Sequence, residues 1–522
     1  MNNFPSTGGT RPRVPPSFYG KTRHIFTVNT QNAGVEKNEK VLALQSGAEE
    51  NVTLLKNFLP AADVLVYRFE TADGKPCAAV YTDGITDKQL LGELAARPLS
   101  LSPAPATREE AEKLLLFPEI KSADDVAAAA KEILSGNPAL LIEGICGAII
   151  LGTKKVTLRA ISEPQTSITV KGPREGFIED VKTNMSLVRR RLITPDLRFE
   201  TLTLGKRSQT AVCIAYLASI ADEKLVGRIC EKLKKTETDG VPDSSYVAQL
   251  LSSSPASPFK QVGTTEKPDV LCAKMLEGRI GILCDGSPIA LTLPYMMSED
   301  FQSAQDYYVS PARATVNRLL RTFAVLLSVF LPALYVAAQL FRLQLLPFGL
   351  LMTVSGGVQG IPLSPSLEMF FLLLVLEILI EASVRMPKYV ALALSVIGAL
   401  VLGDTAVKAG LVSSPAIIII ALSGISAYTV PDLTGTLSLV RMGYVVAAGS
   451  IGTYGIILLT GFLLYYLLCA DEWGVPLLAP FSPLIPHDLR DSLYKADIWA
   501  LSERPNVFRP KNRIRLRKKE TK

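Results

Sequence analysis

Apolar and polar residues are distributed unevenly along this chain. Charged residues are frequent from the N-terminus to Arg321, and then only scattered charges occur before Asp471. A soluble core has no reason to gather apolar residues in one part of the chain. A bilayer does, because each spanning helix needs roughly 20 mostly apolar residues. The pattern therefore predicts a soluble N-terminal region followed by a helical membrane domain.

The soluble region begins with alternating helix and strand patterns. Apolar residues at helical spacing alternate with short runs rich in β-forming residues, which predicts a small α/β domain over residues 41–137. The turn between its two strands is expected at Asp73-Gly74. The expected helices are 48–58, 87–96, 108–116 and 123–134, and the expected strands are 64–69 and 78–81.

A second α/β domain is predicted over residues 138–315. Its expected strands include a hairpin, 279–284 with 289–293, around Asp285-Gly286. One expected helix, 177–192, carries acidic residues early and arginines late, as the helix dipole favours. The other expected elements are strands at 140–142, 147–152, 156–160 and 210–216, a helix at 222–233 and a loop at 252–257.

The membrane domain is predicted over residues 316–470, with four to six helical segments. Its uncharged run 442–470 is long enough for one tilted helix but not for two. Arginines before the first segment and the basic C-terminal tail both predict cytoplasmic ends, which requires an even number of crossings. We therefore expect 415–430 to be re-entrant or interfacial, unless 343–358 adds a crossing. The other candidate segments are 323–341, 365–383 and 389–403.

The two ends of the chain have their own composition. Residues 1–40 are rich in Pro, Gly, Ser and Asn, which predicts a disordered arm, and the first 21 residues have no apolar run of a signal peptide. Residues 471–522 form a predicted cytoplasmic tail whose basic end accounts for the net charge of +6. Such a tail favours contact with anionic lipid headgroups over nucleic acid. The predicted fold class is a multi-pass α-helical membrane domain preceded by two soluble α/β domains.

Catalytic and metal-binding patterns are missing from the sequence. The seven cysteines form no CxxC pair and there are only two histidines, so we expect no zinc or other metal site and no cofactor. The stretch 172–177 superficially resembles a phosphate-binding loop but lacks the required Lys-Ser/Thr spacing. No Ser/His/Asp or H-E-x-x-H arrangement occurs. We therefore expect no enzymatic activity and assign no catalytic residue.

Acidic residues inside the apolar region are candidates for a pore or a gate. Glu377 and Glu381 are four residues apart and so share a helix face. A carboxylate in hydrocarbon costs roughly 2.5–3.5 kcal/mol on insertion scales, so it tends to face protein or water. The alternative is structural pairing with a base such as Arg385. Asp404 and Lys408, also four apart, form either a helix-end salt bridge or part of a pore mouth.

Small residues in the last apolar run are candidates for helix packing. Gly443, Ala448, Gly452 and Gly455 recur at spacings that allow helix backbones to approach closely. The spacing fits contacts within one subunit as well as contacts between subunits.

Several long stretches resemble the A subunits of GerA-type spore germination receptors, and more distantly the SpoVAF-type paralogues. These stretches are VKGPREGFIEDVKTNMSLVRRRL (170–192), SAQDYYVSPARATVNRLLRTFAVLLSVFLPALYVA (303–337), LEILIEASVRMPKYVALALSVIGALVLGDTAVKAGLVS (376–413) and GVPLLAPFSPL (474–484). Asp488, Asp491 and the pair Arg504-Pro505 extend the likeness into the tail.

The resemblance implies a subunit of a nutrient receptor in the inner membrane of bacterial spores, with its N-terminal domains in the spore core. It implies a transporter-like B subunit and a lipoprotein C subunit as partners, and a homo-oligomer that conducts cations when nutrients bind the partner subunits. The alternatives are a transporter-like or accessory permease subunit without a pore, and a membrane-anchored enzyme. The first lacks visible internal repeats here, and the second lacks a catalytic motif.

Overall fold

The computed structural model describes residues 42–153, 171–345, 347–358, 360–385, 404–492 and 494–516. Four predictions lie wholly or mostly outside these residues: the N-terminal arm, the strand 156–160, the membrane segment 389–403 and the basic end of the tail.

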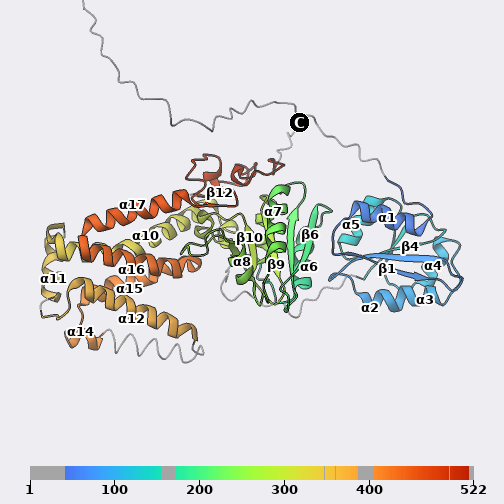
Figure 1. Cartoon of the computed structure of the whole chain (residues 1–522). Helices are drawn as coiled ribbons and strands as arrows, with labels where there is room; N and C mark the ends of the chain where they lie inside the picture. The colour runs from blue at the N-terminus through green and yellow to red at the C-terminus, as the bar shows by residue number, and fades with distance from the viewer. Residues whose placement is uncertain are drawn as a thin grey trace, which may run out of the picture. The chain divides into compact units, whose positions relative to one another are not determined.

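The first α/β domain is a five-stranded antiparallel sheet between two layers of helices (Figure 1). Alternate side chains of its strands point to opposite faces of the sheet. Ala78 and Val80 pack under the helices 48–58 (α1) and 126–134 (α5), whereas Cys77 and Ala79 pack under the shorter helices between residues 88 and 114 (α2, α3 and α4). The sheet order is β1-β2-β4-β5-β3. The strands are β1 (Val64–Glu70), β2 (Pro76–Thr82), β3 (Ile120–Ala123), β4 (Ala139–Ile142) and β5 (Ala148–Leu151), and the helices are α1 (Ala48–Phe58), α2 (Lys88–Leu91) with the π-helical turn Gly92–Ala96, α3 (Arg97–Ser100), α4 (Arg108–Leu114) and α5 (Val126–Leu134).

The predicted boundary between residues 137 and 138 is wrong for this sheet. Strand β4 pairs with β2, and β5 pairs with β3, so both complete the first domain instead of opening the second. The four residues of each strand are buried, and they pack in the two clusters formed with the helical layers of the first domain. Apolar runs show that a strand is buried but not which sheet it joins.

The second α/β domain repeats the same architecture. Its antiparallel sheet has the order β6-β7-β9-β10-β8, with α7 and α8 on one face and α6 and α9 on the other. The expected hairpin of β9 and β10 is confirmed. The strands are β6 (Leu197–Leu204), β7 (Thr210–Leu217), β8 (Gly263–Thr265), β9 (Ile280–Cys284) and β10 (Ala290–Leu293), and the helices are α6 (Val181–Arg191), α7 (Glu223–Lys235), α8 (Ser244–Leu251) and α9 (Pro268–Leu276).

Aspartates cap three helices of this second domain. Asp180, Asp222 and Asp243 each accept a hydrogen bond from a backbone N–H in the first turn of α6, α7 and α8, respectively. Helix α6 therefore begins at Val181, later than the predicted start at residue 177.

The helical domain contains one helix, α10 (Pro311–Phe341), that is long and apolar enough to cross a membrane. A second such span exists if the pair α15 (Ser414–Ala427) and Pro431–Ile451, bent by 112°, counts as one. Both statements concern the described residues alone. The remaining elements are α11 (Phe348–Val358), α12 (Pro365–Arg385), α14 (Ala406–Lys408), the 3-10 turn η6 (Pro431–Leu433), α16 (Thr434–Ile451) and α17 (Thr453–Cys469).

The prediction that 442–470 forms at most one helix is wrong. The run is divided at Gly452, whose φ of +68° ends α16, and α17 then folds back along α16. Positive φ is readily adopted only by glycine, so this residue permits the turn. A hydrogen bond between the hydroxyls of Tyr444 and Thr460 (2.8 Å) joins the two helices.

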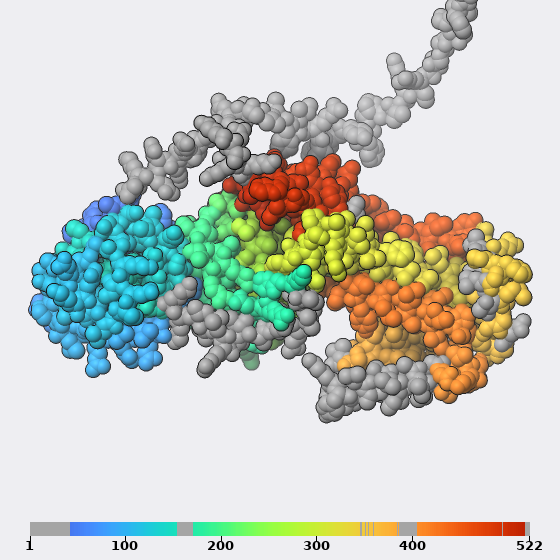
Figure 2. Space-filling view, turned by 180° about the vertical axis from the view of Figure 1, so that it is seen from behind, coloured from blue at the N-terminus to red at the C-terminus, as the bar shows by residue number. Residues whose placement is uncertain are grey.

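Much of the predicted tail is folded onto the second domain. The backbone N–H of Met297 donates to the carbonyl of Leu477, and the Arg504 guanidinium donates to the carbonyl of Leu276. Val507 and Phe508 are buried in a small apolar cluster. In Figure 2 the red atoms of this segment lie against green and yellow atoms of the second domain. The described part of the tail is therefore a structural element and not a free basic arm.

Candidate functional site in the helical domain

Glu377 is paired with Arg441, a partner that the sequence did not suggest. Arg441 Nη2 lies 2.7 Å from Glu377 Oε1, and the arginine side chain is 2% exposed while the glutamate is 28% exposed. The pair joins the middle of α12 to α16. The expected partner, Arg385, instead binds Glu381. Arg441 lies just before the uncharged run, and its separation of 64 positions from Glu377 gave no local signal.

The same arginine extends a polar chain across the helices. Arg441 Nη1 donates to Ser423 Oγ at 3.1 Å, and Ser423 Oγ donates to the carbonyl of Ser328 at 2.8 Å. Ser328 is in α10 and Ser423 in α15, so four helices are linked through one guanidinium. A buried charge with several hydrogen bonds is costly to leave unpaired, and this chain therefore specifies how the helices pack.

Glu381 and the pair Asp404–Lys408 are surface groups within the described chain. Glu381 binds Arg385 at 2.5 Å, and Lys408 binds Asp404 at 2.5 Å, both at helical i,i+4 spacing with every side chain at least 60% exposed. The structure thus contains the salt bridge considered for Asp404 and Lys408. Glu377 and Glu381 share a helix but have different surroundings.

A buried carboxylate that the sequence analysis did not single out lies near the start of α12. Glu368 is fully buried and accepts a hydrogen bond from the backbone N–H of Ser413 through Oε1, whereas its Oε2 has no partner among the described residues. The hydroxyl of Tyr335 lies 3.5 Å from that of Ser413. Glu368 lies in the first turn of α12, and its partner Ser413 is 45 positions away, so no local pattern points to this contact.

The small residues proposed for helix packing lie at the α16–α17 hairpin. A Cβ at Gly455 would come within 2.2 Å of the Ala447 carbonyl oxygen, and Ala448 is fully buried. Gly452 forms the turn, and a Cβ added at Gly443 would come within 3.9 Å of the side chain of Leu459. Gly455 thus allows close contact within this chain.

Charged residues at the start of α10 form a buried ionic cluster. Arg321 binds Asp306 at 2.7 Å and Arg318 binds Asp491 at 3.1 Å, and both Arg318 and Asp306 are almost fully buried. Burial raises the pKa of Asp306, but hydrogen bonds from Arg321 and the Ser303 backbone and the charges of both arginines outweigh it, so the pKa is lowered overall. These arginines, which the sequence analysis used as topological signals, thus bind protein.

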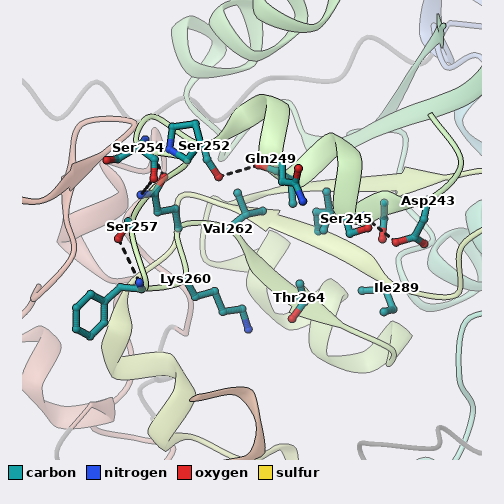
Figure 3. A pocket seen from close by; sticks show the side chains of 16 residues that line it. Asp243, Ser245, Gln249, Ser252, Ser254, Ser257, Lys260, Val262, Thr264 and Ile289 are labelled. Carbon is teal, nitrogen blue, oxygen red and sulfur yellow. Dashed lines mark hydrogen bonds between the residues drawn. The ribbon is translucent and has the colours of Figure 1, made fainter. Parts of the chain in front are cut away.

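A cavity of about 270 Å³ lies in the second α/β domain (Figure 3). Helix α8 and the loop that follows it form its wall, and strands β8 and β10 form its floor. Serine hydroxyls line the loop side, whereas Val262 and Ile289 present apolar surface (Figure 3). Among the described residues, no group of three or more His, Cys, Asp or Glu side chains is arranged to hold a metal ion.

The comparison with protein families identifies the chain. A family model described as "Bacillus/Clostridium GerA spore germination protein" matches residues 53–507. The chain belongs to the GerA family. Spore germination protein KA of Bacillus subtilis (strain 168) is 31% identical over 488 residues, covering 92% of this chain and 90% of the relative. Spore germination protein B1 of the same organism is 31% identical over 484 residues, covering 91% of this chain and all of the relative.

Other matches include a membrane protein and a solved structure. The membrane protein YfkQ of Bacillus subtilis (strain 168), which is described as uncharacterized, is 32% identical over 464 residues, covering 88% of this GerA-family chain and 90% of the relative. The crystal structure of the N-terminal domain of the A subunit of the Bacillus megaterium spore germinant receptor GerK3 is 28% identical, with a TM-score of 0.39, and covers 48% of this chain and 96% of that one.

Proposed function

We propose that this GerA-family chain is the A subunit of a nutrient germinant receptor in the inner membrane of a spore. The observation that carries the proposal is the family match over residues 53–507, together with relatives named spore germination proteins that align over almost their whole length. In this proposal the chain works beside a transporter-like B subunit and a lipoprotein C subunit, and the α/β domains lie in the spore core.

We propose further that the helical domain is a multi-pass membrane domain. Its support is the apolar surface of α10, α12, α16 and α17, since soluble monomers rarely expose large contiguous apolar patches. The large apolar side chains exposed on these helices include Phe323, Leu326, Leu334, Phe371, Ile378, Leu439, Val446, Ile457, Leu458, Phe462 and Tyr465.

The finer proposal is that several copies assemble into a cation-conducting channel. Glu377 keeps more than a quarter of its side chain exposed although Arg441 is buried, and Glu381 is 66% exposed on the same helix. Acidic side chains repeated around a symmetric assembly would form rings, which favour cations. The alternative is a transporter-like or accessory permease subunit without a pore, in which the Glu377–Arg441 pair only fixes helix packing.

Nutrient-triggered germination, compared between spores with and without the gene, tests the proposed role in germination. We expect nutrient-triggered germination to lose its response to at least one nutrient when the gene is deleted, and to regain it on complementation. An unchanged dose-response over a broad nutrient panel would contradict the role in germination.

Charge-neutral variants test the channel. Glu377→Gln keeps the size of the side chain and its hydrogen bonding but removes the charge, and we expect slower cation release at normal protein level. Glu381→Gln is the companion variant, because Glu381 and its partner Arg385 are both exposed. Unchanged release in both variants would leave these acids with a structural role. Disappearance of the Glu377→Gln protein would show that the pair with Arg441 holds the helices together.

A further inference from the structure

We propose that the cavity in the second α/β domain binds a small uncharged molecule rich in hydroxyl groups. We also propose that its occupancy is transmitted to the bend between α15 and α16 by residues 252–261, here called the rim segment. The inference goes beyond the proposed function, because ligand binding in this cavity can be measured without any ion flux. Its size, about 270 Å³, is near the lower end of small-molecule sites.

The lining determines the class of ligand. Its neutral hydrogen-bonding groups come from α8, the rim segment and β8, and they surround an apolar floor. These groups are the side chains of Ser244, Ser245, Gln249, Ser252, Ser254, Ser257, Gln261 and Thr264. Gln261 already bonds the Ser254 backbone with both ends of its amide, and the hydroxyls of Ser244, Ser252 and Ser257 each keep one hydrogen-bonding direction after their bonds within the protein. Hydroxyl groups around an apolar floor suit a molecule that carries hydroxyl groups on a carbon skeleton, because both kinds of surface are then matched.

The two charged residues of the lining are already engaged. Asp243 accepts a hydrogen bond from the backbone N–H of Ser245 at 2.9 Å and caps α8. Lys260 lies 3.6 Å from Asp300 and 3.4 Å from Asp432, and its side chain is 17% exposed. A charged ligand would therefore lose its hydration without gaining a free counter-charge, which is unfavourable. The lining therefore favours an uncharged molecule over an acid or an amine.

The rim segment contacts the helical domain directly. Lys260 binds Asp432 in η6, and the hydroxyl of Thr436 in α16 donates to the carbonyl of Pro258. The ring of Phe259 lies 5.9 Å from the ring of Tyr466 in α17. Lys260, which lines the cavity, and the neighbouring Pro258 thus contact the segment where the chain bends by 112°, and Phe259 contacts α17. A ligand that orders this wall would change the relative free energies of the conformations of the bend. By the same coupling, a change of conformation at the bend would change the affinity of the cavity for the ligand.

A natural reporter lies beside the cavity. Lys232 Nζ donates to the carbonyls of Leu251 and Ser252 at 2.9 and 3.2 Å, and the same ammonium lies 5.2 Å from the centre of the Trp473 ring. Movement of the rim segment would shift this ammonium and so change the fluorescence of Trp473. The chain has two tryptophans, so Trp499→Phe leaves Trp473 as the single emitter.

The binding experiment uses the full chain in detergent micelles with Trp499→Phe. Sorbitol is the neutral probe, and succinate and putrescine are the charged comparators, each titrated by calorimetry and by Trp473 fluorescence. We expect saturable binding of sorbitol alone. Absence of saturable sorbitol binding, or tighter binding of either charged compound, would overturn the proposal.

Matched variants of α8 locate the site. Ala248→Leu places a larger side chain into the cavity, whereas Tyr246→Leu introduces the same residue at an exposed position of the same helix outside the lining. We expect the affinity for sorbitol to fall at least tenfold in the first variant and to stay unchanged in the second. Ser245→Leu is a second filling variant should Ala248→Leu fail to fold. Undiminished binding in a folded filling variant would place the site elsewhere.

Hydrogen–deuterium exchange tests the coupling. We expect sorbitol to change the exchange of peptides covering residues 428–437 in the unaltered chain. This change should be lost when Asp432→Asn and Thr436→Val are combined, although sorbitol still binds. Binding without any change in exchange at the bend would refute the coupling.

Discussion

Replacing Arg189 with methionine should strongly destabilise the soluble part of the chain. Arg189 is fully buried in α6, and its Nε and Nη2 donate to the two carboxylate oxygens of Asp63 at 2.9 and 2.8 Å. Nη1 donates to the carbonyl of Thr194, Nη2 also donates to the carbonyl of Leu197, and the guanidinium lies 5.0 Å from the ring of Phe199. Each of the three guanidinium nitrogens therefore has a hydrogen-bond partner.

The size of the effect follows from the burial of both partners. The side chain of Asp63 is 4% exposed, so Arg189→Met leaves a buried carboxylate without its counter-charge. Removing one member of such a pair costs about 3–5 kcal/mol. In a soluble fragment of residues 46–300, which we expect to fold without the helical domain, this corresponds to a fall in melting temperature of roughly 10 °C.

The assay is urea and thermal unfolding of that fragment, followed by circular dichroism. Arg68→Met is the matched control, because Arg68 binds Glu49 at 2.7 Å but both side chains are 55% exposed, and we expect almost no change there. Combining Asp63→Asn with Arg189→Met should cost less than the sum of the single variants, because the two residues interact directly. A loss below about 1 kcal/mol for Arg189→Met, typical of exposed pairs, would refute the reasoning.

Three further predictions concern the rest of the chain. Burial, opposed mainly by the charge of Lys260, raises the pKa of the Asp300 carboxyl from 3.8 to about 6, so the stability that this carboxyl contributes is full below pH 4 and is lost as the pH rises to 6. Between pH 4 and 7, Asp300→Asn should therefore gain up to about 3 kcal/mol of stability relative to the unaltered chain. Melting temperatures measured against pH test this, and a difference that does not change with pH would contradict it. Gly455→Ala would force a Cβ against the α16 backbone and should cost about 1–3 kcal/mol, whereas Gly461→Ala on the same helix meets nothing within 4 Å and should leave thermal unfolding in detergent unchanged. Cysteines placed at residues 6 and 521 should both resist external thiol labelling, and labelling of either one would contradict an even number of crossings.

Local patterns predicted most individual elements of the two α/β domains. The helix at 48–58 and the hairpin of β9 and β10 follow from side-chain periodicity and turn chemistry, which are properties of neighbouring residues. Strands β3, β6 and β8 and helices α3, α8 and α9 were not predicted. Strand β6 alternates buried and exposed side chains only partly, and α8 and α9 are short helices whose apolar faces become evident only against the sheet.

The candidate site shows the same limit. The sequence alone indicated which acids lie in apolar surroundings, because charge is rare there, and it gave the i,i+4 salt bridge of Asp404 with Lys408 as one of two alternatives. It did not indicate that Glu377 binds Arg441 or that Glu368 is fully buried beside Ser413. Both contacts join residues more than 40 positions apart, and no local pattern encodes them.

The sequence by itself determined the division into a polar α/β region and an apolar helical region, most of the helices and strands, and membership of the GerA family. These depend on composition, periodicity and long matching stretches. Only the tertiary structure decided that β4 and β5 complete the first sheet, that Gly452 divides the last apolar run, and that Arg441 neutralises Glu377. The reason is physical: strand order, the direction of a turn and the partner of a buried charge are set by which distant surfaces pack together, and a residue's own neighbours in the chain do not specify those surfaces.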